Sequence, residues 1–338
     1  MSLNPRSREG HEKISQPRKI GELTTVMGNA DSRILTLQVV QDCAEWFHLG
    51  SDAVDLFSRF EEIDDLAAEW LGTHGPEVLQ LNGLKTLSDA AAVSLGRDRG
   101  RLELNGLLSL SDPAIESLSE HRHLLHLNGL AQISDLAAES LSRHRGSLEV
   151  NGLTRLSDAA ARSLGRHGGD LHLDGLTELS DAVAESLGNH RGHLGLGGLK
   201  RLSDVAAESL SKHRGDLSLY GLTNLSDSAA ESLSRHEGLL RLDGLKSLSD
   251  AAAESLSRHR GGIYLLFLAE LSPQGATALA NSQSWMHLQL HLLPQSAAEI
   301  LRTRTPREPP KPQSSMPSHP KYMISRFLKR LKIPWPRT

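Results

Sequence analysis

Four side chains in the middle of the chain, Asp170, His172, Asp174 and His193, are of the types that bind a metal ion or move a proton. Asp170 and His193 lie 23 residues apart, in a chain that repeats with this period, so a parallel sheet would place them on adjacent strands. One histidine with carboxylates from neighbouring strands can reach a zinc-like ion. An ordinary polar strand face accounts for the same residues, and this is the interpretation we adopt. The sequence therefore predicts no metal site and no cofactor.

Histidine also recurs with this 23-residue spacing, at His121, His144, His167, His190, His213, His236 and His259. Seven imidazoles along one edge could bind metal or respond to pH. The alternative, which we favour, is that each lies in the last turn of a short helix, where it interacts favourably with the helix dipole. No carboxylate recurs beside them in the sequence to complete a set of ligands.

No motif in the sequence predicts catalysis. His-Glu-x-x-His, Gly-x-Ser-x-Gly and paired Cys-x-x-Cys motifs do not occur. Gly195-Leu-Gly-Gly198 looks like part of a phosphate-binding loop but is the ordinary strand and turn of the repeat, with Gly in two variable positions. The single cysteine, Cys43, has no histidine nearby in the sequence and is expected to be buried packing. We expect a protein that is not an enzyme and has no small-molecule substrate. The repeated aspartates are expected to cap helices: Asp89, Asp112, Asp135, Asp158, Asp181, Asp204, Asp227 and Asp250.

The element that positions all these residues is a 23-residue repeat. Apolar residues at positions one and three predict a short strand, and Gly at position five predicts a turn. Ser-Asp then predicts the start of a helix, an Ala-rich stretch its buried face, and His-Arg-Gly its end, with Gly at the C-cap. No unit can bury its own apolar face, so neighbours must stack. Eight units begin at Leu79, Leu102, Leu125, Leu148, Leu171, Leu194, Leu217 and Leu240.

This pattern resembles a leucine-rich repeat, closest to the cysteine-containing type, in a bacterial-like tandem array over residues 63–301. In that type the unit runs Leu-x-Leu-x-x-Cys-x-x-Ile-Thr-Asp, and Leu130-Ala-Gln-Ile-Ser-Asp135 occupies its second part. The resemblance implies an α/β solenoid, a curved horseshoe with parallel strands inside and short helices outside, that serves as a protein-binding scaffold. Leu130 stands where the family has a buried Cys or Asn, so we expect its hydrogen-bonded ladder to be missing.

Composition divides the 338 residues into an acidic body and a basic extension. Residues 302–338 carry ten Lys and Arg against one acid, Glu308, and eight of the 14 prolines. Aromatic residues gather at both ends of the array, and we expect them to cap its core, although a ligand pocket would also use them. The expected segments are a disordered N-terminal segment (1–29), an N-terminal cap with a degenerate repeat (30–78), the eight repeats (79–262), degenerate repeats and a cap (263–301), a Pro-rich linker (302–320) and a basic amphipathic tail (321–338).

The strand positions that vary between units are expected to face away from the core and to bind a protein or peptide partner on the concave face. Their charge is net acidic, which suits a basic or mixed segment and should repel nucleic-acid phosphates. The same positions could also be merely solvated. The candidate residues are Arg101, Glu103, His126, Glu149, Asp170, His172, Asp174, Asp216, Tyr220, Arg241 and Asp243.

The extension offers an alternative function. Residues 321–333 predict a short amphipathic helix, whose surface-binding residues would be Arg326, Phe327, Lys329, Arg330 and Lys332. It could lie on an anionic membrane, contact nucleic acid, dock on a partner, or fold back onto the acidic body. The polar start of the chain, the single cysteine and the lack of a membrane-length apolar run predict a cytoplasmic protein.

Overall fold

A computed structural model describes residues 33–44, 47 and 57–303. Strands and helices alternate along this part of the chain, and each strand has two or three residues. The strands are β1 (Ile34–Leu35), β2 (Glu62–Ile63), β3 (Val78–Gln80), β4 (Arg101–Glu103), β5 (Leu125–His126), β6 (Leu148–Glu149), β7 (Leu171–His172), β8 (Leu194–Gly195), β9 (Leu217–Ser218), β10 (Leu240–Arg241), β11 (Ile263–Leu265) and β12 (Met286–Leu288).

The helices are short, because each must fit within one repeat. They are α2 (Leu37–Cys43), α3 (Asp65–His74), α4 (Asp89–Leu95), α5 (Asp112–Ser119), α6 (Asp135–Ser142), α7 (Asp158–Leu164), α8 (Asp181–Leu187), α9 (Asp204–Leu210), α10 (Asp227–Ser234), α11 (Asp250–Ser257), α12 (Pro273–Ala280) and α13 (Gln295–Arg302), with the 3-10 helix η2 (Leu290–Leu292) before the last of them.

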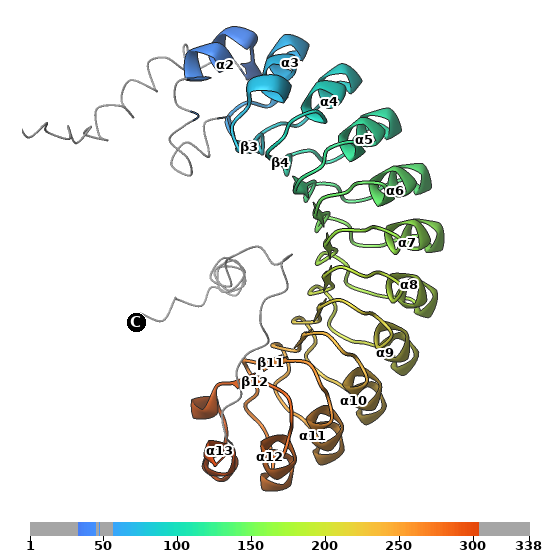
Figure 1. Cartoon of the computed structure of the whole chain (residues 1–338), viewed down its shortest axis with the longest axis vertical. Coiled ribbons are helices and arrows are strands. Elements are labelled where there is room, and N and C mark those ends of the chain that lie inside the picture. Colours follow the sequence, from blue (N-terminus) through green and yellow to red (C-terminus); the bar gives the residue numbers. More distant parts are fainter. Residues whose placement is uncertain (1–32, 45–46, 48–56, 304–338) are drawn as a thin grey trace, which may run out of the picture.

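The strands β3 to β12 form one parallel ten-stranded sheet in sequence order, and β1 pairs with β2 in a separate small sheet. The register advances by one unit per strand, so that Leu125 pairs with Leu148 and Leu148 with Leu171. Figure 1 shows the helices on the outside of an arc and the strands on its inside. Parallel strands are about 4.8 Å apart, whereas packed helices need about 8–10 Å. This difference bends the stack, and the predicted α/β leucine-rich-repeat solenoid is confirmed.

The helices of the eight repeats, α4 to α11, begin as the sequence predicts but end differently. Ser134 is the N-cap of α6, and its side chain accepts a hydrogen bond from the backbone N of Ala137, with Asp135 in the first turn. The helix ends at Ser142 with Arg143 as its C-cap, so the prediction that the glycine after His-Arg is the C-cap is wrong. Where a glycine is the C-cap, in α4, α7 and α8, it is an earlier one that precedes the histidine position. The repeated glycines after the histidines serve another purpose: a Cβ on Gly169 would lie 2.2 Å from the backbone O of Gly146 in the preceding unit. These glycines let the loops stack closely.

The core is a continuous column of leucine and alanine between the sheet and the helices. Phe57 and Phe60 are buried at its N-terminal end, where Phe47 and Trp70 pack against them as the predicted aromatic cap. At the C-terminal end the cap is aliphatic instead, made by α13 with Leu293 and Leu301. Cys43 is buried as predicted, and burial raises the pKa of its thiol.

Several expectations fall outside the described residues, namely those on residues 1–29, on Trp46, and on the linker and basic tail beyond residue 303. Within the described ranges, none of the helices has the length and apolar character needed to cross a bilayer.

Candidate binding face on the concave side

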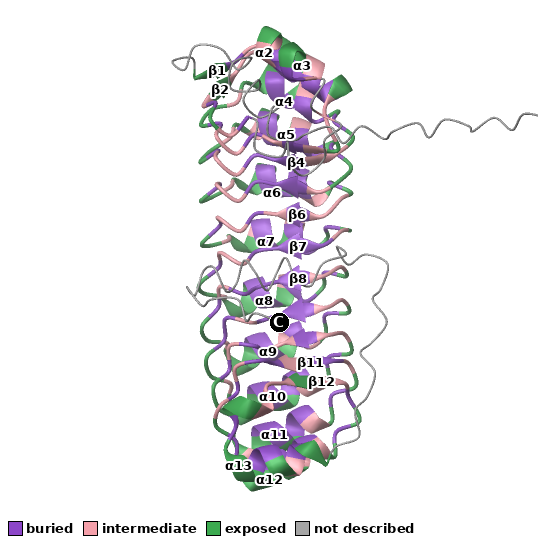
Figure 2. Ribbon diagram, turned by 90° about the vertical axis from the view of Figure 1, so that its left-hand side faces the viewer, coloured by how far each residue is buried: buried purple, intermediate pink, exposed green. Residues whose placement is uncertain are grey.

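Pairing in register turns position two of the repeat into a continuous row across the concave face. The row contains Gln80, Glu103, His126, Glu149, His172, Gly195, Ser218, Arg241, Tyr264 and His287. Position one beside each of them is a buried leucine or isoleucine in units one to nine, so the row lies on the opposite face of the sheet. Figure 2, which views the side facing away from the helices, shows the strands as a column in which buried residues predominate. Of the residues expected on the concave face, this row contains Glu103, His126, Glu149, His172 and Arg241.

The N-terminal part of the row alternates acids and a histidine. Nε2 of His126 lies 3.3 Å from Oε1 of Glu149, and its Nδ1 lies 3.8 Å from Oε1 of Glu103. The guanidinium Nε of Arg101 lies 2.7 Å from the same Glu103 oxygen. Asn128 donates a hydrogen bond to Oε2 of Glu149 at 3.1 Å. These contacts hold the carboxylates in place, and the Arg101 guanidinium neutralises part of the charge of Glu103.

The middle of the row brings His172 and His193 together, with ring centroids 4.9 Å apart. The carboxylates beside them accept hydrogen bonds from backbone amides. Asp170 accepts from the backbone N of His193 at 3.0 Å, and Asp174 accepts from the backbone N of Gly197 at 2.7 Å. Within the described part of the chain, no three His, Cys, Asp or Glu side chains are placed to share a metal ion. Burial, and secondarily the proximity of Asp170, raises the pKa of Asp216, two strands further on.

The C-terminal part is aromatic. The guanidinium of Arg241 lies over the rings of Tyr220 and Tyr264, 5.9 and 5.2 Å from their centroids. Its Nε and a terminal nitrogen both lie 3.0 Å from Oδ2 of Asp243, whose side chain is 1% exposed. Trp285 packs edge-on against Tyr264 at 5.0 Å. We name the set Tyr220, Arg241, Tyr264, Trp285 and His287 the aromatic strip.

The aromatic strip corrects one expectation and adds residues that sequence reasoning missed. Tyr264 and Trp285 were expected to cap the core, but they lie on the concave face because they occupy position two of one unit and the position before the next strand. His287 joins them by the same register. The signal was present in the sequence, since counting 23 residues from Arg241 reaches Tyr264 and then His287.

A hydrogen-bonded ladder, expected to be missing, is present at a different position. Oδ1 of Asn82 accepts from the backbone N of Asn105, and the same contact recurs through Asn128 and Asn151 at 2.9–3.1 Å. Asn151 then accepts from the backbone N of Asp174 at 2.8 Å. Position four therefore joins consecutive turns, as the buried Cys or Asn was expected to do. Asp174, predicted as a partner contact, continues this ladder.

The repeated aspartates do not cap their own helices, and here the prediction was wrong. The preceding serine caps, and in most units it also donates its hydroxyl to the aspartate of the unit before, as Ser134 does to Asp112 and Ser203 to Asp181, both at 2.6 Å. The serine thus accepts from its own helix and donates to the neighbouring repeat. This row links the helices on the convex side.

The repeated histidines are also placed differently from expectation. His144 lies beyond the end of its helix and is 1% exposed, and the other six are equally buried. Burial lowers the pKa of each of the seven, to about 4 for His167 and about 3 for His190. A neutral imidazole cannot act as the cation that a helix dipole favours. The row is part of the core and does not line the concave face.

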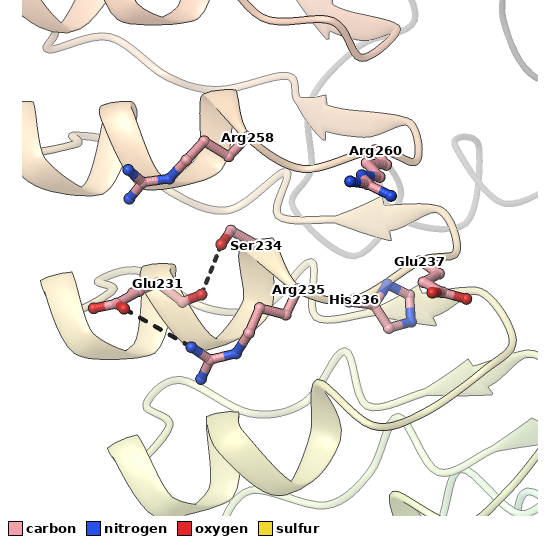
Figure 3. A pocket seen from close by; sticks show the side chains of 7 residues that line it. All are labelled: Glu231, Ser234, Arg235, His236, Glu237, Arg258 and Arg260. Carbon is pink, nitrogen blue, oxygen red and sulfur yellow. Dashed lines mark hydrogen bonds and ion pairs between the residues drawn. The ribbon is translucent and has the colours of Figure 1, made fainter.

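A pocket of about 490 Å³ lies beside α10 and α11 (Figure 3). It is lined by Glu231, Ser234, Arg235, His236, Glu237, Arg258 and Arg260. Two of its three arginines already have partners: Arg235 reaches Glu231 at 3.8 Å, and Arg258 reaches Glu254 at 3.7 Å. Arg143 pairs with Glu139 in the same way in an earlier unit. Because the lining repeats with the array, we assign no separate site to it.

The fold and the concave row define a leucine-rich-repeat solenoid. No family model matches the sequence, and no curated protein is significantly similar to it. Among solved structures, an internalin from Listeria monocytogenes is similar, with 13% identity and a TM-score of 0.41 over 76% of this chain and 83% of the internalin. A leucine-rich-repeat protein from Leptospira interrogans has 14% identity and a TM-score of 0.38 over 83% and 80%. Likeness at these levels carries no information about the partner of this chain.

Proposed function

We propose that this protein is a non-enzymatic scaffold that binds a protein or peptide segment along its concave face. The observation that carries the proposal is the position-two row, which is continuous across the sheet while its side chains differ from unit to unit. The core positions beside it hardly vary. The row ends in the aromatic strip, and Tyr, Trp and Arg are the residues that most often dominate binding energy in interfaces.

The charge of the face favours a basic or mixed partner. Asp170, Asp174 and Asp216 make no ion pair with any residue that the structure describes, and each accepts a hydrogen bond from a backbone amide. An approaching cation would therefore find Asp174 and Asp216 partly exposed, with Asp170 buried beside them at 6% exposure. Nucleic acid is the wrong partner for this surface, because its phosphates would be repelled.

The experiment is a capture assay with the purified full-length chain as bait. Tyr264→Ala with Trp285→Ala should reduce capture of a specific partner at least tenfold. The matched control is Leu136→Ser with Val205→Ser, which alters two exposed apolar side chains on the convex helices, 65% and 54% exposed. Equal loss in both pairs would contradict recognition by the concave face.

The repeat is proposed to be of the cysteine-containing type, on the match at Leu130 to Asp135. The protein is proposed to be cytoplasmic, on its single buried thiol, which fractionation of the source cells would test. The alternative function is a peripheral protein acting through residues 321–333 on an anionic membrane or nucleic-acid surface, supported by the four cations interleaved with an apolar stripe.

A further inference from the structure

Several polar side chains of the concave face are deeply buried. His126 and Ser218 are each 2% exposed, and Asp243 is 1% exposed. They lie on the face of the sheet away from the helices, and the described helices all lie on the other side (Figure 1). Oδ1 of Asp243 is buried and has no hydrogen-bond partner in the described structure. Polar atoms buried on such a face are normally paired with something that covers them.

We propose that the basic C-terminal segment of this chain, residues 304–338, docks on the concave face between Asp170 and Trp285 and competes there with outside partners. The docking itself needs no outside partner, whereas the competition rests on the proposed function. The occupant is identified by charge, by apolar character and by reach.

Charge favours this segment over the other part of the chain that lies outside the structure. Residues 304–338 contain nine Lys and Arg against the single acid Glu308. Residues 1–32 contain five against four acids and are almost neutral. The face to be covered offers Asp170, Asp174 and Asp216 without a cation partner in the described structure. Opposite charges on the two surfaces favour and orient their encounter.

The apolar side chains of the C-terminal segment also match the aromatic strip of the concave face. The predicted helix at residues 321–333 places Phe327, Leu328 and Leu331 on one stripe. Tyr264 and Trp285 on the aromatic strip are partly exposed and pack edge to face, which leaves apolar ring surface for such side chains. A helix of 13 residues is about 20 Å long, close to the roughly 24 Å that five strand spacings occupy between Trp285 and Asp170. The cations would then lie beside the aspartates while the stripe contacts the rings.

The chain can reach this position without strain. The described part ends just after α13, in the unit that carries Trp285 and His287. Seventeen residues, 304–320, separate that point from the predicted helix and can span up to about 56 Å. A tether of this length holds its ligand at an effective concentration near the millimolar range. Weak intrinsic affinity is therefore enough to keep the segment bound.

The test measures binding of a fluorescein-labelled synthetic peptide, residues 318–338, to full-length chains by anisotropy. The native chain should bind it weakly, because its own tail occupies the face. A chain carrying Arg326→Glu, Lys329→Glu, Arg330→Glu and Lys332→Glu should bind the same peptide at least tenfold more tightly. Binding should weaken as salt is raised.

A second pair of variants, made in that tail-reversed chain, locates the site. Asp170→Asn, Asp174→Asn and Asp216→Asn should lower peptide affinity at least tenfold, since each keeps a side-chain oxygen for its backbone amide and loses only charge. The control is Glu116→Gln, Glu185→Gln and Glu208→Gln, three exposed carboxylates on the convex helices. Circular dichroism melts of all chains should coincide within a few degrees.

Three outcomes would overturn the proposal. The peptide could bind the native and tail-reversed chains equally, or lose affinity equally for the aspartate variant and the glutamate control variant. It could also bind anionic vesicles and none of the chains. The last would favour the membrane alternative. Failure of the scaffold function is a separate result, because it would appear as absence of a captured partner with the tail-reversed chain while the peptide still binds.

Discussion

His144 and His167 stack with their ring centroids 5.9 Å apart and 4° between their planes, although 23 residues separate them. All six successive pairs of the row show this geometry, with centroids 5.7–6.1 Å apart. Asp98 and Ser282, both buried, occupy the same position in the units on either side. The row is therefore a column of imidazoles enclosed at both ends by buried polar residues.

This column predicts that the fold is lost in acid. In the unfolded chain a histidine takes up its proton near pH 6.5, whereas burial and neighbouring imidazoles lower the folded pKa to about 4 for His121, His167 and His236. Between these values the unfolded state binds more protons, so stability is present above pH 6.5 and falls as the pH approaches 4. Each pKa unit is worth about 1.4 kcal/mol, and several such groups approach a typical domain stability of about 5–15 kcal/mol. Urea titrations at pH 7.5, 6 and 5 would measure the slope.

Two histidine variants distinguish the pH effect of the buried column from that of an exposed histidine. His167→Gln removes one ring from the middle and should flatten the pH dependence between 6.5 and 4, although it lowers stability at pH 7.5. His291→Gln changes an exposed ring and should alter neither. A native chain whose urea midpoint stayed constant down to pH 4.5 would contradict a buried neutral column.

A second prediction ranks three substitutions in the unit that starts at Leu148. Leu153→Ala should cost about 2–5 kcal/mol through lost burial and a cavity, since Leu153 is fully buried. Ser157→Ala should cost about 1–2 kcal/mol, because Ser157 accepts from the backbone N of Ala160 at 2.9 Å and donates to Asp135. Asp158→Ala should cost less, about 0.5 kcal/mol, as an acid in the first turn. Chemical denaturation measures all three, and a larger loss for Asp158→Ala than for Ser157→Ala would reverse our assignment of the cap.

The sequence was sufficient for the architecture because the repeat specifies each element several times over. Strand, turn and helix start are encoded in every unit by residues whose local preferences agree, and stacking follows from apolar faces that no single unit can bury. The sequence also predicted that Glu103 and Arg241 lie on the concave face. Side chains alternate along a short strand, so a residue next to a buried leucine, Leu102 or Leu240, must face the other side.

What the sequence did not predict depends on contacts between units. The sequence analysis assigned position four no role in joining the units, whereas Oδ1 of Asn128 accepts from the backbone N of Asn151 in the next unit. His167 was interpreted through its own helix, whereas its environment is the ring before it and the ring after it. For the histidines the signal was near-invariance across units, which marks residues that hold the array together. The asparagine ladder gave a weaker signal, because Asn recurs at position four in only four of the eight units.

The last prediction concerns two adjacent glycines that differ in what surrounds them. A Cβ on Gly197 would meet the Tyr220 ring, with Cζ at 2.0 Å, whereas a Cβ on Gly198 would meet the backbone O atoms of Asp174 and Leu176 at 2.3 and 2.4 Å. The end of the Tyr220 side chain can move, but stacked backbone cannot. Gly197→Ala should therefore cost less than about 1 kcal/mol, and Gly198→Ala should cost about 3 kcal/mol, the upper end of what overpacking costs. Urea denaturation gives the two free energies, and near-UV circular dichroism should report displacement of the Tyr220 ring in Gly197→Ala alone. If Gly197→Ala keeps the native stability and loses partner or peptide binding, Tyr220 contributes to recognition through its position on the concave face. Similar losses of unfolding free energy in the two variants would contradict the different surroundings described for Gly197 and Gly198.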